Sequence, residues 1–187
     1  MSIAGAERDG GRPAHILRAG FLWASRRDAL RRLALAVPPA RSLVRRFVAG
    51  ESLSEALVAL ASLQRVGFGT TVDVLGESVR TAPEAAAAAD RYVATIDALV
   101  TRGLDRNVSL KLTQMGLDLD PEACRANLRR VLEAAHDAGA FVRVDMEDHT
   151  RTDVTLDIVR RLRSAYPAVG VVIQAYLRRS AADLERL

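Results

Sequence analysis

Five residues of types that bind or react with ligands lie in or just after short apolar runs: Glu77, Lys111, Asp145, Met146 and Gln174. Lys111 is the only lysine in a chain whose other positive side chains are arginines. A lysine ammonium is a compact charge that suits a tight pocket, which the planar guanidinium of arginine does not fit. Lys111 is therefore a candidate to bind a substrate carboxylate or to form a Schiff base. The structural alternative is a lysine that reaches solvent from a strand end.

Three further polar residues are candidates by position. Asp145 ends an apolar run, where a carboxylate can orient a cation, accept a proton or brace a loop. Gln174 carries donors and an acceptor at the end of an apolar strand, which suits a flavin, a nucleobase or loop backbone. Glu77 follows Gly76, which lets the chain turn tightly, and a glutamate there suits a helix start or an active-site rim.

An acidic string at 145–148, followed by His149, suggests a divalent metal site because carboxylates suit hard cations. The string has no second acidic cluster beside it in the sequence and no other histidine at ligand spacing, so we expect no metal. Cys124 lies in a predicted helix without a histidine partner, and we expect it to be structural rather than nucleophilic.

Apolar and β-branched runs alternate with amphipathic segments from residue 51 onward. Strands are predicted over 70–75, 108–112, 141–146 and 171–176, with Lys111 inside the second, and helices over 52–66, 81–101, 120–138, 152–165 and from 180. Pro167 and Gly170 are expected to bracket the break before the last strand. Strands that alternate with helices of this length predict parallel βαβ units.

Two parallel architectures fit this alternation, an open doubly wound sheet and a (βα)₈ barrel. The doubly wound nucleotide fold needs a glycine-rich turn after its first strand, and that turn is absent from the sequence. Polar residues follow each strand, where (βα)₈ enzymes hold their active sites. We therefore predict an α/β fold of TIM-barrel type that comprises the first four βα units only. Such an incomplete barrel would have two unpaired edges and an apolar concave face.

The composition is that of a globular protein with one sizeable core: 187 residues, 49% hydrophobic and 27% charged. Apolar runs are too short for a membrane span, a secretory signal is lacking, and a single cysteine fits a reducing cytosol. Residues 1–50 hold ten arginines against three acidic residues, so we expect a basic helical segment there. Its charge suits anionic lipid, and the 4% aromatic content disfavours nucleic acid.

Five motifs of this sequence resemble those of the proline dehydrogenase family, in the family's order and spacing. They are RFVAGE at 46–51, DVLGE at 73–77, SLKLT at 109–113, VDMED at 144–148 and VIQAY at 172–176. The resemblance covers about residues 41–187. It implies two parts, a basic helical segment over 1–50 and the first half of a proline dehydrogenase-like barrel over 51–187.

The resemblance also implies a function. Family members hold non-covalent FAD in a distorted barrel, oxidise L-proline to 1-pyrroline-5-carboxylate and pass electrons to membrane quinone. By this resemblance Lys111 binds the proline carboxylate, Asp145 lies among the catalytic residues, and Glu77 forms an ion-pair gate over the substrate. Met146 and Gln174 would contact the flavin. The expected location is the cytoplasm, with peripheral contact at the inner face of the membrane.

Three family motifs are absent from this sequence: RLVKGAY on the fifth strand, a late His-Asn strand motif and paired arginines on the last barrel helix. We therefore expect that the chain is an amino-terminal fragment that alone neither holds FAD tightly nor oxidises proline. The other half would follow in the same gene or come from another chain. Two alternatives stay open, a Schiff-base lyase or aldolase that uses Lys111, and a non-catalytic half-barrel remnant.

Overall fold

A computed structural model describes residues 48–76 and 79–187 of the chain. The chain divides into two compact units, residues 1–51 and 52–187. Nearly all of the first unit, including the predicted amino-terminal helices, lies outside the described residues. Glu77 lies outside them as well. The second unit contains every strand and helix described below.

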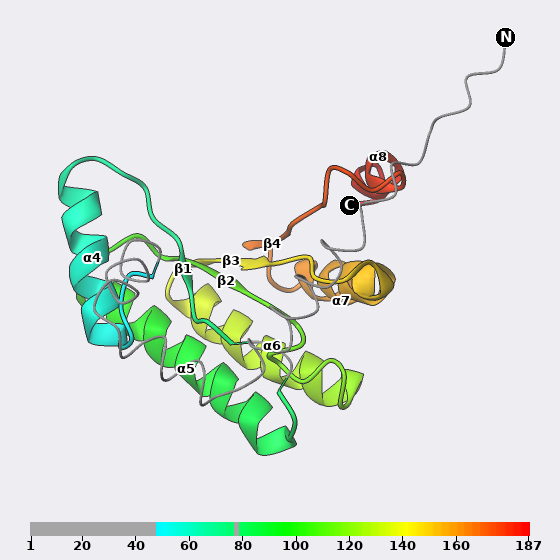
Figure 1. Cartoon of the computed structure of the whole chain (residues 1–187), viewed down its shortest axis with the longest axis horizontal. Coiled ribbons are helices and arrows are strands. Elements are labelled where there is room, and N and C mark those ends of the chain that lie inside the picture. Colours follow the sequence, from blue (N-terminus) through cyan, green and yellow to red (C-terminus); the bar gives the residue numbers. More distant parts are fainter. Residues whose placement is uncertain (1–47, 77–78) are drawn as a thin grey trace, which may run out of the picture. The chain divides into compact units, whose positions relative to one another are not determined.

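Four short parallel strands form one sheet in the order β1-β2-β3-β4 (Figure 1). The strands are β1 (Val72–Asp73), β2 (Asn107–Leu110), β3 (Phe141–Val144) and β4 (Val169–Val171). A helix connects each strand to the next, so this part of the chain is built from consecutive βαβ units. The predicted α/β class and parallel four-stranded sheet are confirmed. Within the described residues, the outer edges of β1 and β4 have no strand partner.

Five helices of the described residues accompany the sheet: α4 (Leu53–Arg65), α5 (Ala82–Thr101), α6 (Pro121–Asp137), α7 (Thr152–Arg163) and α8 (Ser180–Leu184), with a 3₁₀ turn η1 (His149–Arg151) before α7. Local sequence sets where they begin. Thr81 begins α5 with a capping box, because its hydroxyl accepts from the Glu84 N–H at 3.4 Å and the Glu84 carboxylate accepts from the Thr81 N–H at 3.2 Å. Asp120 caps α6 by accepting from the Glu122 N–H at 2.9 Å.

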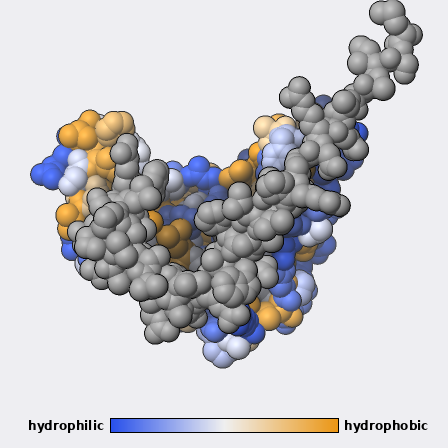
Figure 2. Space-filling model, in the orientation of Figure 1, coloured by the Kyte–Doolittle hydropathy of each residue, from blue (hydrophilic) through white to orange (hydrophobic). Residues whose placement is uncertain are grey.

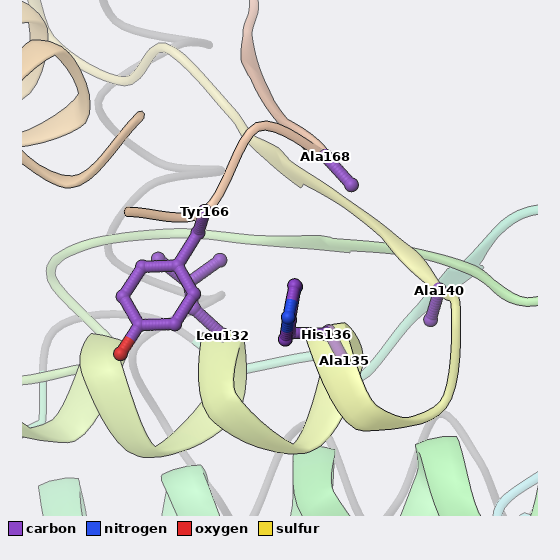
Figure 3. Close-up of a pocket in the computed structure, with 6 residues that line it drawn as sticks. All are labelled: Leu132, Ala135, His136, Ala140, Tyr166 and Ala168. Atoms are coloured by element: carbon purple, nitrogen blue, oxygen red, sulfur yellow. The ribbon is translucent and has the colours of Figure 1, made fainter. Parts of the chain in front are cut away.

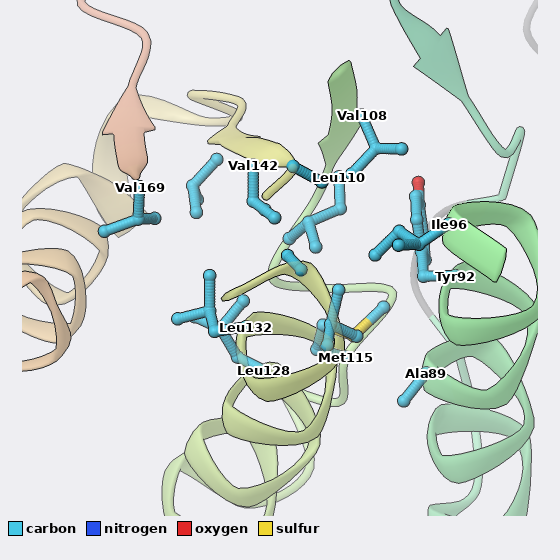
Figure 4. Close-up of a cluster of buried hydrophobic side chains, with 14 of the residues drawn as sticks. Ala89, Tyr92, Ile96, Val108, Leu110, Met115, Leu128, Leu132, Val142 and Val169 are labelled. Carbon is cyan, nitrogen blue, oxygen red and sulfur yellow. The ribbon is translucent and has the colours of Figure 1, made fainter. Parts of the chain in front are cut away.

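One face of the sheet is apolar and packs on the helices. Val72, Val108, Val142 and Val169 are paired across the four strands in one register row, and all four are buried. Figure 4 shows side chains of α5 and α6 facing these strands, with Ile96 from α5 near Val108 and Leu128 and Leu132 from α6 nearer Val142. This layer is the core that holds the strands in place.

The other face of the sheet is polar, so the prediction of an apolar concave face was wrong. The next register row pairs Asp73 with Ser109, Ser109 with Arg143, and Arg143 with Gly170. Alternation along the strands produces this result, because valines and Leu110 take the positions that face the helices. The positions between them are polar apart from Phe141 and Gly170. The Arg143 guanidinium donates to the Asn107 side chain at 3.3 Å. Any group that covers this face must therefore satisfy charged and hydrogen-bonding side chains.

All four strands end before their predicted ends, and two of these differences concern residues named in the sequence analysis. Lys111 lies just after β2 rather than inside it, because its carbonyl accepts from the Gln114 N–H at 3.1 Å and the chain turns there. Gly170 lies inside β4 rather than at a break before it. A Cβ at Gly170 would lie 2.7 Å from Cζ of Phe141 on β3, so the glycine lets that aromatic ring rest against β4. Because β4 ends at Val171, Gln174 follows the strand.

Hydrophobic side chains also gather on the surface of α4 and the turn after it (Figure 2). They are Val58, Leu63, Val66 and Phe68, which are 45–70% exposed. None of the helices in the described part of the chain is long and apolar enough to cross a membrane.

Candidate active site

The carboxyl ends of the first three strands bring one ammonium and two carboxylates together. Lys111 Nζ lies 3.1 Å from Asp73 Oδ2 and 3.6 Å from Asp145 Oδ2. Asp73 is the last residue of β1, whereas Lys111 and Asp145 directly follow β2 and β3. A hydrogen bond from the Asp145 N–H to the Leu110 carbonyl, at 2.8 Å, fixes the relative height of those two strand ends. Two of the residues singled out in the sequence, Lys111 and Asp145, thus lie close together.

These three side chains are partly shielded from water. Their exposed fractions are 21% for Lys111, 30% for Asp73 and 24% for Asp145. Water therefore screens their charges only partly, and the two carboxylates stabilise the ammonium form of Lys111. A fixed, half-buried cation of this kind can bind a carboxylate through charge-assisted hydrogen bonds.

A second polar group connects the ends of β2, β3 and β4. The Glu147 carboxylate accepts from the Thr113 N–H at 3.0 Å and from the Thr113 hydroxyl at short distance. Gln174 Nε2 donates to the Glu147 backbone carbonyl at 2.9 Å. Gln174 is therefore anchored to the backbone of Glu147, which lies two residues after Asp145 in the chain. Its Oε1 is buried and has no hydrogen-bond partner among the described residues.

The remaining sequence candidates are less constrained by contacts. Met146 is half-buried between Asp145 and Glu147. His149 is exposed, with Nδ1 at 3.3 Å from Asp148 Oδ1. No group of three or more His, Cys, Asp or Glu side chains within residues 48–76 and 79–187 is arranged to hold a metal ion.

Cys124 is fully buried, and its Sγ lies 3.5 Å from the Leu112 carbonyl. Burial raises the pKa of this thiol to about 12, so it stays protonated and does not act as a nucleophile near neutral pH.

Asp73 and Tyr92 were missed as functional candidates in the sequence. Tyr92 is fully buried on α5, and its hydroxyl lies 3.2 Å from Asp73 Oδ1. Burial, and secondly the charge of Asp73, raise the pKa of Tyr92 well above its ordinary value, so the hydroxyl keeps its proton. Two sequence features point to this pair. Asp73 interrupts an otherwise uncharged β-branched run, and Tyr92 is the only aromatic residue of α5.

Two cavities lie near the amino ends of the strands, away from Lys111 at the carboxyl ends. Figure 3 shows the smaller, of about 10 Å³, which has room for roughly one water. It is lined by Leu132, Ala135, His136, Ala140, Tyr166 and Ala168. The other is an open depression of about 550 Å³ beside Arg143 and the residues before β1 and β2. Neither contains the ammonium or the carboxylates described above, so we take neither as the reaction site.

Comparison with known families decides what this strand-end arrangement belongs to. Residues 56–187 match the family model described as proline dehydrogenase. The chain belongs to the proline dehydrogenase family. The family resemblance expected from the five motifs is thereby confirmed. The matched segment contains Lys111, Asp145, Met146 and Gln174, and it also contains the two residues that sequence reasoning missed.

Curated relatives give the same family with partial coverage. Proline dehydrogenase 1 of Bacillus subtilis (strain 168) is 37% identical over 172 residues, which cover 92% of this chain and 57% of the relative. Proline dehydrogenase of Deinococcus radiodurans is 39% identical over 147 residues, which cover 76% of this chain and 47% of the relative. The chain thus spans about half the length of the curated relatives it matches.

Solved structures show the same fold. A crystal structure of proline utilization A from Bdellovibrio bacteriovorus, inactivated by N-propargylglycine, is 27% identical to this chain with a TM-score of 0.72. That similarity covers 79% of this chain and 18% of the larger protein. A structure of a bifunctional proline utilization A protein covers 98% of this chain with a TM-score of 0.61 at 22% identity.

Proposed function

We propose that this chain carries the proline-binding part of an FAD-dependent proline dehydrogenase, which oxidises L-proline to 1-pyrroline-5-carboxylate. The observation that supports this most directly is the Lys111 ammonium, held by Asp73 and Asp145 at the carboxyl ends of three parallel strands. In barrels of parallel strands, the reacting groups stand at that edge. The fold we propose is accordingly of (βα)₈ type, of which residues 51–187 provide four units and residues 1–50 a basic helical segment.

Lys111 has the role of binding the substrate carboxylate. Proline is a zwitterion, so its carboxylate needs a cation and its secondary amine must lose a proton before the ring carbon can release hydride. Asp145 orients the Lys111 ammonium, which fixes the ring of a bound proline relative to the sheet. Glu77 has the role of an ion-pair gate over the substrate. In the reaction the amine first loses its extra proton to solvent, which frees the nitrogen lone pair. The C–H bond beside nitrogen then breaks, its hydrogen and electron pair leave as hydride, which a bound flavin would accept, and the lone pair forms the C=N bond.

The residues near the end of β4 fit a flavin. Gln174 Oε1 is a buried acceptor without a donor among the described residues, which a ring N–H of a flavin would supply. Gln174 and the half-buried Met146 would hold FAD from the ends of β4 and β3. When bound, FAD supplies the hydride acceptor that amino-acid side chains lack. The Thr113–Glu147 hydrogen bonds fix the loop on which both contacts depend.

We further propose quinone as the electron acceptor and a cytoplasmic location with peripheral contact at the membrane. The support is the arginine excess within residues 1–50. Binding of the chain to vesicles with an anionic lipid should weaken as salt rises. Binding that does not respond to salt would count against this part of the proposal.

The geometry disfavours a Schiff-base mechanism at Lys111. An amine nucleophile must be unprotonated, and enzymes achieve this by desolvation or by a neighbouring cation. Lys111 instead contacts two carboxylates and keeps partial exposure, which favours the ammonium. Borohydride trapping of a carbonyl substrate on Lys111 would reverse this conclusion.

A chimeric enzyme tests the proposed function. We would replace the aligned part of the Bacillus subtilis relative with this chain and measure dye reduction with L-proline. Lys111→Met should lower kcat/KM by about 30-fold or more, because the carboxylate loses its buried counter-charge. Arg102→Met, which removes an exposed charge beyond the end of α5, should leave it unchanged. A chimera that binds FAD but does not oxidise proline would refute the proposal.

The 187-residue chain alone should hold FAD weakly and reduce no dye with proline. The sheet it forms is open at β1 and β4 within the described residues, so a flavin there would contact one side only. The measurement is flavin absorbance after purification, together with proline-dependent dye reduction. Robust turnover by the purified chain would contradict this expectation.

A further inference from the structure

The Tyr92 hydroxyl lies at the centre of a buried hydrogen-bond cluster beneath the strand ends. It lies 2.8 Å from the Ser109 carbonyl, 3.2 Å from Asp73 Oδ1 and 3.2 Å from Gln114 Oε1, and it accepts from the Val74 N–H at 3.2 Å. Figure 4 shows Tyr92 on α5 with its oxygen directed toward the strands. The Val74 carbonyl, at 3.4 Å, is a fourth acceptor beside this hydroxyl. A phenol has one proton, so the four acceptors compete for it, and a hydrogen bond to the charged carboxylate is the strongest kind among them.

Gln114 fixes one side of this cluster. Its side chain is fully buried, and Nε2 donates to the Val74 carbonyl at 2.9 Å. This bond turns Oε1 toward the Tyr92 hydroxyl, where it serves as an acceptor. Gly76 leaves the necessary room, because a Cβ there would lie 2.8 Å from Gln114 Nε2. The surroundings of the hydroxyl are therefore held by groups that do not rotate freely.

Asp73 connects this cluster with Lys111. One carboxylate oxygen, Oδ1, faces the Tyr92 hydroxyl, and the other, Oδ2, lies 3.1 Å from Lys111 Nζ. The two carboxylate oxygens of Asp73 thus contact different partners, the Tyr92 hydroxyl in the core and the Lys111 ammonium at the candidate site. Its rotation about χ2 would break both contacts at once.

We propose that Tyr92 is a positioning residue for the Lys111 ammonium and that it acts through Asp73. The inference rests on the proposed function in one respect, that Lys111 is the group that receives the substrate carboxylate. Tyr92 does not touch that substrate. It fixes the Asp73 carboxylate, and the fixed carboxylate holds the ammonium where the carboxylate of proline would bind.

The single lysine makes a direct measurement feasible. An amine-reactive reagent can label only Lys111 and the amino terminus, and mass spectrometry separates the two. Labelling requires the unprotonated amine, so its rate at fixed pH reports how well neighbouring groups stabilise the ammonium. The 187-residue chain can be used without FAD or substrate.

Tyr92→Phe should raise the labelling rate of Lys111 by about 2- to 4-fold, because the Asp73 carboxylate is held less firmly beside the ammonium. Asp73→Asn should raise it by about 10-fold, because that carboxylate is lost while Asp145 remains. The double variant should match Asp73→Asn within about 1.5-fold, since Tyr92 acts through Asp73. Tyr166→Phe is the matched control. It removes a hydroxyl that contacts Glu133 at 3.3 Å, away from Lys111, and should leave the rate unchanged.

Two results would overturn the inference: no change in Tyr92→Phe, or an equal change in wild-type and Asp73→Asn backgrounds. If Tyr92→Phe fails to fold, 3-fluorotyrosine in all three tyrosines keeps the test open. In the fluorine NMR spectrum, Asp73→Asn should shift the Tyr92 resonance and leave Tyr166 and Tyr176 in place. An unmoved Tyr92 resonance would refute the link. These results are independent of proline oxidation by the chimera, so either proposal can fail alone.

Discussion

A single glycine determines how closely the segment after β1 approaches Gln114. The backbone of Gly76 needs no unusual φ, so the glycine serves close packing rather than the tight turn that its type suggested. In Gly76→Ala the new methyl group would press on a buried, hydrogen-bonded amide. We expect a loss of about 1–3 kcal/mol in the free energy of unfolding, measured by urea denaturation.

Gly69→Ala is the control for that substitution. A Cβ at Gly69 meets no atom within 4 Å, and the residue precedes the same strand. Its effect should stay within about 0.5 kcal/mol. Equal losses in the two variants would show that close contact with Gln114 is not what Gly76 provides.

Cys124 gives a pH dependence with a definite sign. Burial raises the pKa of the folded thiol to about 12, so the thiol of the unfolded chain, with its ordinary pKa of 9.0, ionises first. Stability is therefore intact below pH 9.0 and falls as the pH rises from 9.0 toward 12, by at most about 1.4 kcal/mol per pH unit.

Urea denaturation at pH 8 and pH 10 of wild type and Cys124→Ala would measure this effect. The variant should lose less stability than wild type between the two pH values. Parallel losses in both proteins would contradict the assignment, since other groups titrate equally in each.

The sequence predicted two of the three charged groups at the site. Lys111 was recognisable as the only lysine of the chain, and Asp145 because it ends an apolar run. Asp73 also interrupts an uncharged run, but nothing local shows its partners, which lie 38 residues away at Lys111 and 19 residues away at Tyr92. A tyrosine in an alanine-rich helix is ordinarily a core residue. Only the packing of α5 beneath β1 and β2 gives its hydroxyl a charged partner.

At the scale of elements, α5 positions Tyr92, so the start of this helix matters to the site. Thr81→Ala removes the hydroxyl half of the capping box and should cost about 1 kcal/mol of stability, measured by urea denaturation. Thr101→Ala is the control at the other end of α5, where the hydroxyl contacts the Asp97 carbonyl within the helix. An equal loss at both ends would contradict a specific capping role.

Element order was predictable, whereas strand bounds were not. Capping residues and periodicity mark helices locally, and the helices that begin after Ser52, Thr81 and Asp120 were found where expected. Strand ends depend on partners. β1 is limited to the two residues that pair with β2, and Gly170 belongs to β4 because it pairs with Arg143 of β3. The alternation of polar and apolar residues along the sequence predicts neither of these two strand bounds.

At the scale of the described unit, two features favour association: the unpaired edges of β1 and β4, and the hydrophobic surface of α4. Edges and apolar patches of this kind recruit other chains. Size-exclusion chromatography with light scattering should show a mass that rises with protein concentration. Val58→Glu, on the exposed face of α4, should reduce the rise. A monodisperse monomer at all concentrations would contradict this expectation.

The trio of Asp73, Lys111 and Asp145 has a consequence for ligand selection. With two carboxylates and one ammonium, the three side chains together carry a net negative charge before any ligand binds. A simple anion would add to this negative charge and would have to displace one of the two carboxylates from the ammonium. An amino acid brings its own cation, which the displaced carboxylate can accept. The arrangement of these three charges thus favours dipolar molecules over simple acids of the same size.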